Sequence, residues 1–265
     1  MPFALFRWEQ ASLLFFSYVL VCALLLRGLS PAARVKSATG SFIGLAIVLF
    51  GAAIQPASQI WRGLLLPALA LLIAYWSSGL LFRAPSAAVE AFLRHADAIL
   101  RIRETAASAP RVTAEFLEFA YAAVYALVPV ALVLYLLETP SDLIDVDRFW
   151  TVVLATDFIC FGMLPWIQSR PPRAVEEDDP WRSSFRRFNL RVLGSTSIQV
   201  NTCPSGHAAE ALVAALLVSS APAPIFVAVL FAAAAVSAGA VYGRYHYALD
   251  VVSGWAVALV VWALL

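Results

Sequence analysis

The sequence predicts an all-α fold in which a polytopic bundle of helices spans a membrane. Hydrophobic residues make up 62% of the 265 residues, charged residues make up 13%, and the mean hydropathy is +0.82. Soluble domains carry about a quarter of their residues as charged ones, so this composition excludes an ordinary soluble fold. Eight apolar runs distributed along the chain supply the helices.

The lengths of these runs decide how many spans we expect. They cover residues 11–26, 41–54, 63–82, 116–137, 149–167, 208–219, 225–241 and 247–265. Crossing a bilayer takes about 20 residues, with about 17 as a practical minimum, so the second and sixth runs are short. We therefore expect six to eight spans. Residues 1–112 would form N-terminal transmembrane helices with one surface helix, and residues 113–265 a transmembrane core that carries the polar motifs.

The surface helix is predicted at residues 87–104. Glu90, Arg94, His95 and Asp97 alternate there with apolar residues at near-helical spacing, which is typical of an amphipathic helix lying on a membrane. We interpret it as a connector with a solvated charged face, and a gate for substrate is the alternative. His95 is expected on the surface.

The longest polar stretch covers residues 169–202. Arg170-Pro171-Pro172-Arg173 directly follows a predicted span. Because proline fixes φ, both arginines are held stiffly at the membrane mouth, where they can bind an anion. The acidic run at residues 176–179 predicts a solvated turn, and a divalent-cation site is the alternative.

His246 and Asp250 lie at the start of the last apolar run. A spacing of four places them on one face of a helix, so the carboxylate can fix the imidazole tautomer. The other ring nitrogen is then available as a nucleophile or general base. A purely structural pair is the alternative, but ionisable groups at the mouths of membrane spans are functional candidates by default.

Pro204-Ser205-Gly206-His207 opens an earlier apolar run. Ser205 stands at a natural N-cap position, and Gly206 permits close approach to the backbone. Free amides at a helix N-terminus suit a phosphate group, which His207 would face from the first turn. The apolar stretch between His207 and His246 is long enough for a helical hairpin, so both histidines should open on one membrane face. A simple helix cap is the alternative.

Other chemistries fit the residues less well. Ser205 is not in a G-x-S-x-G elbow, which disfavours a serine hydrolase. Cys203 is followed by Ala209 where a cysteine phosphatase would need arginine. The two histidines with Asp250 could form a metal site, but the nearby arginines favour phosphate. No basic run with interleaved aromatic residues points to nucleic acid.

The motifs at residues 204–207 and at His246-x-x-x-Asp250 resemble the second and third signatures of the type 2 phosphatidic acid phosphatase (PAP2) superfamily. The sequence Arg244-Tyr245-His246-Tyr247 and the element at residues 170–173 resemble its inositol-phosphorylceramide-synthase-like branch. The resemblance covers about residues 149–265. The first signature of the family has a lysine where this chain has Met163, and the third has an arginine where this chain has Ala240.

The resemblance implies a mechanism without cofactor or metal. His246 would attack phosphorus to form a phosphohistidine, Asp250 would orient it, and His207 would protonate the leaving oxygen. Ser205 and Gly206 would cradle the phosphoryl oxygens. Because the cations at 163 and 240 are missing, we expect the phosphate to be bound by arginines that the chain does carry, namely Arg170, Arg173 and Arg244.

These observations together predict an enzyme that hydrolyses a lipid phosphomonoester or diphosphate within the bilayer. A phosphotransferase acting on an alcohol is the runner-up. A proton-coupled transporter is a third hypothesis. We disfavour it because we expect the ionisable groups to gather at the mouths of the spans and not deep inside them. The oligomeric state is left open.

The side of the membrane follows from the distribution of charge. With eight spans, 15 of the 18 Lys and Arg residues lie on the side of the site, which predicts a cytoplasmic face, in the cell membrane. The family resemblance favours the outer face instead. We follow the charge distribution.

Overall fold

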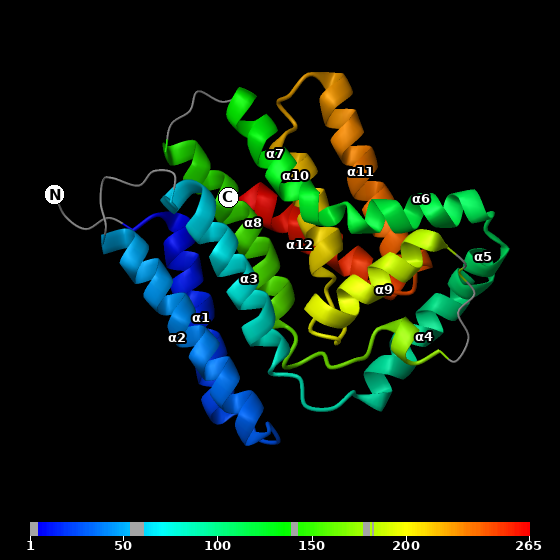
Figure 1. Ribbon diagram of the computed structural model, residues 1–265, viewed down its shortest axis with the longest axis horizontal. Helices are drawn as coiled ribbons and strands as arrows, with labels where there is room; N and C mark the ends of the chain where they lie inside the picture. Colours follow the sequence, from blue (N-terminus) through cyan, green and yellow to red (C-terminus); the bar gives the residue numbers. More distant parts are fainter. Residues whose placement is uncertain (1–4, 54–60, 139–142, 177–180, 182) are drawn as a thin grey trace.

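A computed structural model of the chain describes residues 5–53, 61–138, 143–176, 181 and 183–265 (Figure 1). These residues form twelve α-helices, which confirms the all-α class. The helices are α1 (Arg7–Leu25), α2 (Pro31–Ala53), α3 (Leu66–Gly79), α4 (Ala87–Ile99), α5 (Ile102–Ser108), α6 (Arg111–Ala122), α7 (Val124–Glu138), α8 (Leu143–Gly162), α9 (Ser184–Thr196), α10 (Gly206–Leu217), α11 (Ala223–Tyr242) and α12 (Ala248–Leu264). A π-helical turn, Trp61–Leu65, precedes α3, and a 3-10 turn, Pro172–Ala174, precedes α9.

Two groups of helices share one hydrophobic core. In the first group α1 packs against α2, α3 and α8, and Phe15 of α1 stacks on Phe158 of α8 with ring centroids 4.3 Å apart. In the second group α10 is central and packs against α7, α8, α11 and α12. Helix α8 therefore joins the two groups (Figure 1).

Four helical segments of the described chain are long and apolar enough to cross a membrane: α1, α2, Arg62–Gly79 and α11. The consecutive helices α6 and α7, bent by 58°, make up a fifth if they act as one span. A multi-pass membrane protein is thus supported, whereas the predicted six to eight spans are not shown. The difference lies in α10 and α12, which have 12 and 17 residues, and in α8, which carries Asp147, Arg148 and Asp157.

The predicted surface helix is two helices. The chain breaks at Arg101, whose φ of 52° is left-handed, so α4 and α5 follow one another at an angle. His95 is exposed, as expected. The expectation that the charged residues of this helix are solvated is wrong for Glu90 and Asp97. Both are buried, because Glu90 binds Arg170 and Asp97 binds Arg244.

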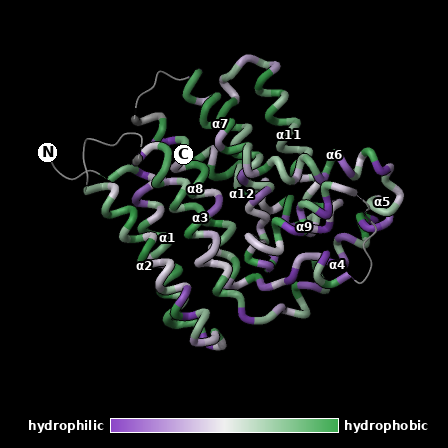
Figure 2. Tube along the Cα trace, viewed as in Figure 1, coloured by the Kyte–Doolittle hydropathy of each residue, from purple (hydrophilic) through white to green (hydrophobic). Residues whose placement is uncertain are grey.

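The polar helices gather at one end of the bundle. Hydrophilic residues are concentrated over α4, α5 and α9 (Figure 2). The α1–α2 connection, the end of α3 and the start of α10 lie toward the same end (Figure 1). This end holds the candidate site. In the acidic run, residues 177–179 lie outside the described chain.

Candidate active site

The two histidine motifs meet where α10 and α12 begin. The amide of Ser205 donates a 2.8 Å hydrogen bond to the carbonyl oxygen of Asp250. Close contact here requires glycine in α12, because a Cβ on Gly254 would lie 2.5 Å from the Ser205 carbonyl oxygen. The imidazoles of His207 and His246 consequently face each other with ring centroids 6.1 Å apart. Both line one pocket.

Ser205 caps α10, which confirms the N-cap prediction. Its hydroxyl accepts a 3.3 Å hydrogen bond from the amide of Ala208, and the residue is fully buried. Gly206 reaches the pocket instead. A side chain there would meet Phe161, whose Cε1 lies 2.9 Å from the position of a Cβ, so glycine keeps the start of α10 open to a ligand.

Asp250 lies behind His246, but the predicted common helical face is wrong, because α12 begins at Ala248 and His246 precedes it in the turn. Its Oδ2 is 3.6 Å from Nδ1 of His246, which is longer than a hydrogen bond. The same oxygen accepts hydrogen bonds from the amide of Tyr247 at 2.8 Å and from Asn201 Nδ2 at 2.9 Å. Asn201 also donates to Ser169 Oγ at 3.0 Å. Asn201 could not be identified from the sequence, because its role depends on a contact between distant segments.

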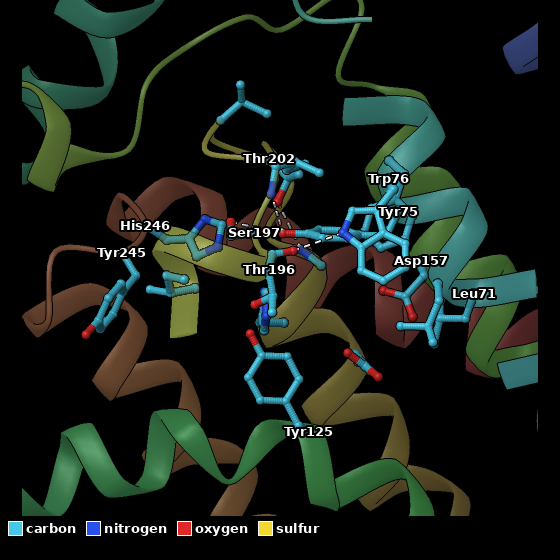
Figure 3. Close-up of a pocket in the computed structure, with 18 of the residues that line it drawn as sticks. Leu71, Tyr75, Trp76, Tyr125, Asp157, Thr196, Ser197, Thr202, Tyr245 and His246 are labelled. Carbon is cyan, nitrogen blue, oxygen red and sulfur yellow. Dashed lines mark hydrogen bonds between the residues drawn. The ribbon is translucent and has the colours of Figure 1, made fainter. Parts of the chain in front are cut away.

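The pocket in front of the histidines has a volume of about 170 Å³. Helices α3, α8, α9 and α10 contribute to its wall, together with the junction of α6 and α7. His246 and Tyr245 lie on one side of it, and Asp157, Tyr75 and Trp76 on the other (Figure 3). A small polar headgroup can therefore lie between a histidine side and an acidic, aromatic side.

Comparison with known proteins identifies the region that carries this site. Residues 148–265 match the model of the PAP2 superfamily. This region is a PAP2 superfamily domain. The match gives no support to the narrower inositol-phosphorylceramide-synthase-like branch. No curated protein and no solved structure gave a significant match to the chain.

Arg173 is the predicted arginine that the PAP2 domain brings to the pocket. Its guanidinium carbon lies 5.3 Å from the centre of the Tyr245 ring, and its Nη1 donates to the Tyr245 carbonyl oxygen at 3.5 Å. Among the described residues that line the pocket, no other is an arginine or lysine. Arg173 is thus positioned to bind an anion held between the histidines.

Arg170 points to the amphipathic helix instead. Its Nε and Nη2 donate to the two carboxylate oxygens of Glu90 at 3.0 and 2.9 Å, and its amide adds a third bond at 2.9 Å. Hydrogen bonding to Arg170 lowers the pKa of Glu90. This pair fastens α4 to the loop after α8.

Arg244 is also engaged in ion pairs. Its guanidinium donates to Asp97 Oδ2 at 2.7 Å and to Glu176 Oε1 at 2.5 Å, and the residue is 2% exposed. The backbone has a φ of 60°, which is unfavourable for a side-chain-bearing residue. The two carboxylates hold Arg244 in this conformation, and His246, two residues further on, lines the pocket.

Aromatic residues that the sequence did not single out support the histidines. The rings of Tyr121 and Tyr245 stack with centroids 4.0 Å apart, and Tyr245 donates to Glu118 Oε2 at 2.6 Å. Tyr121 and Tyr125 lie 5.6 and 5.8 Å from the His207 ring. In the sequence Tyr121 and Tyr125 are ordinary members of an apolar run, so only packing identifies them, whereas Tyr245 belongs to the motif that contains His246.

Two carboxylates of the pocket lie within helices. Asp157 is in α8 and Glu210 is in α10, and both line the pocket. The expectation that ionisable groups gather at the mouths of the spans is therefore wrong here. Both residues are visible in the sequence as single acids inside the apolar runs 149–167 and 208–219.

The geometry gives little support to a cysteine nucleophile or to a metal site. Burial raises the pKa of the Cys203 thiol to about 12, so it stays protonated at neutral pH and is a poor nucleophile. Within the described part of the chain, no three His, Cys, Asp or Glu residues are arranged as a metal site.

Proposed function

We propose that the PAP2 domain hydrolyses a lipid phosphomonoester or diphosphate through a phosphohistidine on His246. One observation carries the proposal: His207 and His246, from separate motifs, face each other across a pocket that also contains Arg173. The superfamily match is consistent with a phosphatase that acts through histidine. Asp250 behind His246 supports the assignment of His246 as nucleophile.

In the first step, Nε2 of His246 attacks phosphorus and the bond from phosphorus to the lipid oxygen breaks. Burial, His246 and Arg173 disfavour the protonated form of His207, and the negative charge of the bound phosphate favours it. His207 then gives its proton to the leaving oxygen, so that the lipid departs as an alcohol, or as a monophosphate from a diphosphate. Arg173 binds the phosphoryl oxygens. Nδ1 of His246 faces Asp250, which stabilises the positive charge that develops on the ring.

In the second step, water attacks the phosphohistidine. His207 accepts a proton from that water, the bond between phosphorus and Nε2 breaks, and phosphate leaves. Both histidines then return to their starting states. In this proposal Arg170 and Arg244 do not bind the phosphate but position the loop after α8 and the turn before α12, because both are committed to ion pairs.

A lipid substrate is supported by the wall that α3 contributes. Leu72 and Trp76 line the pocket, and each side chain is also 47% exposed on the surface of the bundle. A hydrocarbon chain can leave the pocket past these residues into the bilayer while its headgroup stays with the histidines.

The test is phosphate release by the purified protein in detergent. A panel of phosphatidate, phosphatidylglycerol phosphate, polyprenyl diphosphate and sphingoid phosphates should include at least one substrate, and a chelator should not change its turnover. Excess glycerol, inositol or diacylglycerol should leave the products unchanged. A new phosphodiester that depends on the added alcohol would favour the phosphotransferase, and chelator-sensitive turnover would favour a metal site.

A further inference from the structure

Asp157 and Glu210 have no role in the proposed reaction. Asp157 is 1% exposed, and neither of its carboxylate oxygens accepts a hydrogen bond from any residue that the structure describes. Removing a carboxylate from water without a partner is strongly unfavourable. Its position in the pocket wall, together with Glu210, indicates that a ligand supplies the missing partner.

Charge is separated along the pocket. Arg173 lies against the Tyr245 ring, and the rings of His207 and His246 face each other. Asp157 lies on the side of the pocket opposite His246 and Tyr245 (Figure 3). Arg173 is the only lysine or arginine among the described lining residues, so no side-chain cation of the wall neutralises the acidic end. A ligand with a negative group at one end and a positive group at the other matches this distribution.

The surroundings of the acidic end favour an ammonium group over a metal ion. Tyr75, Trp76, Tyr125 and Phe161 line the pocket with their aromatic rings. Aromatic faces attract organic cations, whereas divalent cations need several oxygen ligands. The hydroxyl of Tyr75 is already bound, since it donates to Ser197 Oγ at 3.1 Å and accepts from the Ile198 amide at 3.2 Å.

We propose that Asp157 and Glu210 bind a protonated amine of the substrate, and that the substrate is the phosphate ester of a β-amino alcohol. The inference rests on the proposed function and specifies its substrate class. Glu210 stands one helical turn after His207, a spacing of about 5–6 Å between Cβ atoms. In such an ester an oxygen and two carbons separate nitrogen from phosphorus. The amine therefore reaches the carboxylates while phosphorus lies between the histidines.

The experiment compares substrates that differ only in the charge of the amine. Phosphate release is measured from a sphingoid base 1-phosphate and from its N-acetylated analogue, and kcat/KM should favour the amine by about tenfold or more. Asp157→Asn and Glu210→Gln should each move this ratio toward one. Glu104→Gln, which changes an exposed carboxylate on α5, should keep the wild-type ratio.

A binding measurement makes the inference independent of turnover. The His246→Ala variant, which cannot form the phosphohistidine, should be stabilised against heat more by the amine than by its N-acetylated analogue, and adding Asp157→Asn should remove the difference. Phosphatidylethanolamine and its N-acetylated form make a second pair. If only the sphingoid base pair shows a preference, the bound amine belongs to the lipid base. If the phosphatidylethanolamine pair shows one, the bound amine belongs to the headgroup.

The outcomes separate the two proposals. If the protein releases phosphate without distinguishing amine from amide, or if Asp157→Asn leaves the ratio unchanged, the two carboxylates share a proton within the bundle and the inference is overturned. If no phosphate is released from any substrate but the binding preference is present and depends on Asp157, the phosphatase proposal fails and the amine site stands.

Discussion

The backbone amide of Arg173 donates a 3.0 Å hydrogen bond to the carbonyl oxygen of Arg244. This bond joins the loop after α8 to the turn before α12, and so connects two polar segments that are distant in the sequence. The two side chains then diverge: Arg173 lines the pocket, and Arg244 is buried between Asp97 and Glu176. One arginine is available to a ligand and the other is structural, and mutagenesis can separate the two roles.

Arg173→Ala should lower kcat/KM by about 10- to 100-fold, the loss expected for a charge-assisted hydrogen bond to phosphate. Arg173→Lys should recover part of the activity, because it keeps the charge but not the forked geometry. Arg187→Ala removes an exposed arginine of α9 and serves as the control. Equal activity of the Arg173→Ala variant and this control in a phosphate-release assay would exclude Arg173 from substrate binding.

Arg244→Met should destabilise the protein by about 3–5 kcal/mol, because it leaves the buried carboxylate of Asp97 and the half-buried one of Glu176 without their partner. The apparent melting temperature in detergent measures the effect. Adding Asp97→Asn and Glu176→Gln should restore part of the loss, since the remaining groups are neutral. An Arg244→Met variant that melts like the wild type would contradict the structural role.

The catalytic assignments predict three different phenotypes. His246→Ala should abolish turnover, because the nucleophile is gone, whereas Asp250→Asn should leave residual activity, because only orientation and charge are lost. His207→Ala should spare substrates with good leaving groups, such as an aryl phosphate, more than natural lipid phosphates, since it supplies only the leaving-group proton. Steady-state assays on both substrate classes check this. Wild-type turnover by His246→Ala would rule out the phosphohistidine.

The pair of Glu90 and Arg170 predicts a pH-dependent contribution to stability. Because the hydrogen bond lowers the folded-state pKa of Glu90 below its unfolded value of about 4.3, the stabilisation is complete above that pH. It is lost as the pH falls through the lowered pKa. Glu90→Gln should therefore destabilise the protein at neutral pH by about 1 kcal/mol, a small value because half of the Arg170 side chain is exposed.

Melting curves of the wild type and Glu90→Gln should accordingly differ at neutral pH and converge in strong acid. Glu104→Gln, at an exposed position, should follow the wild type throughout. A difference that grows on acidification would mean that the carboxylate of Glu90 is stabilised in its protonated form.

The distribution of Lys and Arg predicts that the site faces the cytoplasm. A cysteine introduced at Arg187, exposed on α9, should react with a membrane-impermeant maleimide in inverted vesicles and not in intact cells. The wild-type chain, which contains half-buried Cys203, measures the background. Labelling in intact cells would place the site on the outer face, as the family resemblance favours.

The sequence by itself determined the features that depend on neighbouring residues. Long apolar runs can only satisfy their backbone in a membrane as helices, so the all-α class followed from composition. The N-cap at Ser205 and the proximity of Asp250 to His246 are local geometry, set by spacings of three and four residues. The two motifs were sufficient to predict that both histidines open on one face of the membrane.

Only the tertiary structure decided which charged groups meet. Three arginines stood near the motifs in sequence, and the packing of α4 against the core commits Arg170 and Arg244 to carboxylates, leaving Arg173 at the pocket. The packing of α8 against α10 likewise brings Asp157 and Glu210 into one cavity. An ion pair or a pocket joins residues that are distant in the chain, so helix packing chooses its members and no local sequence pattern shows which residues meet.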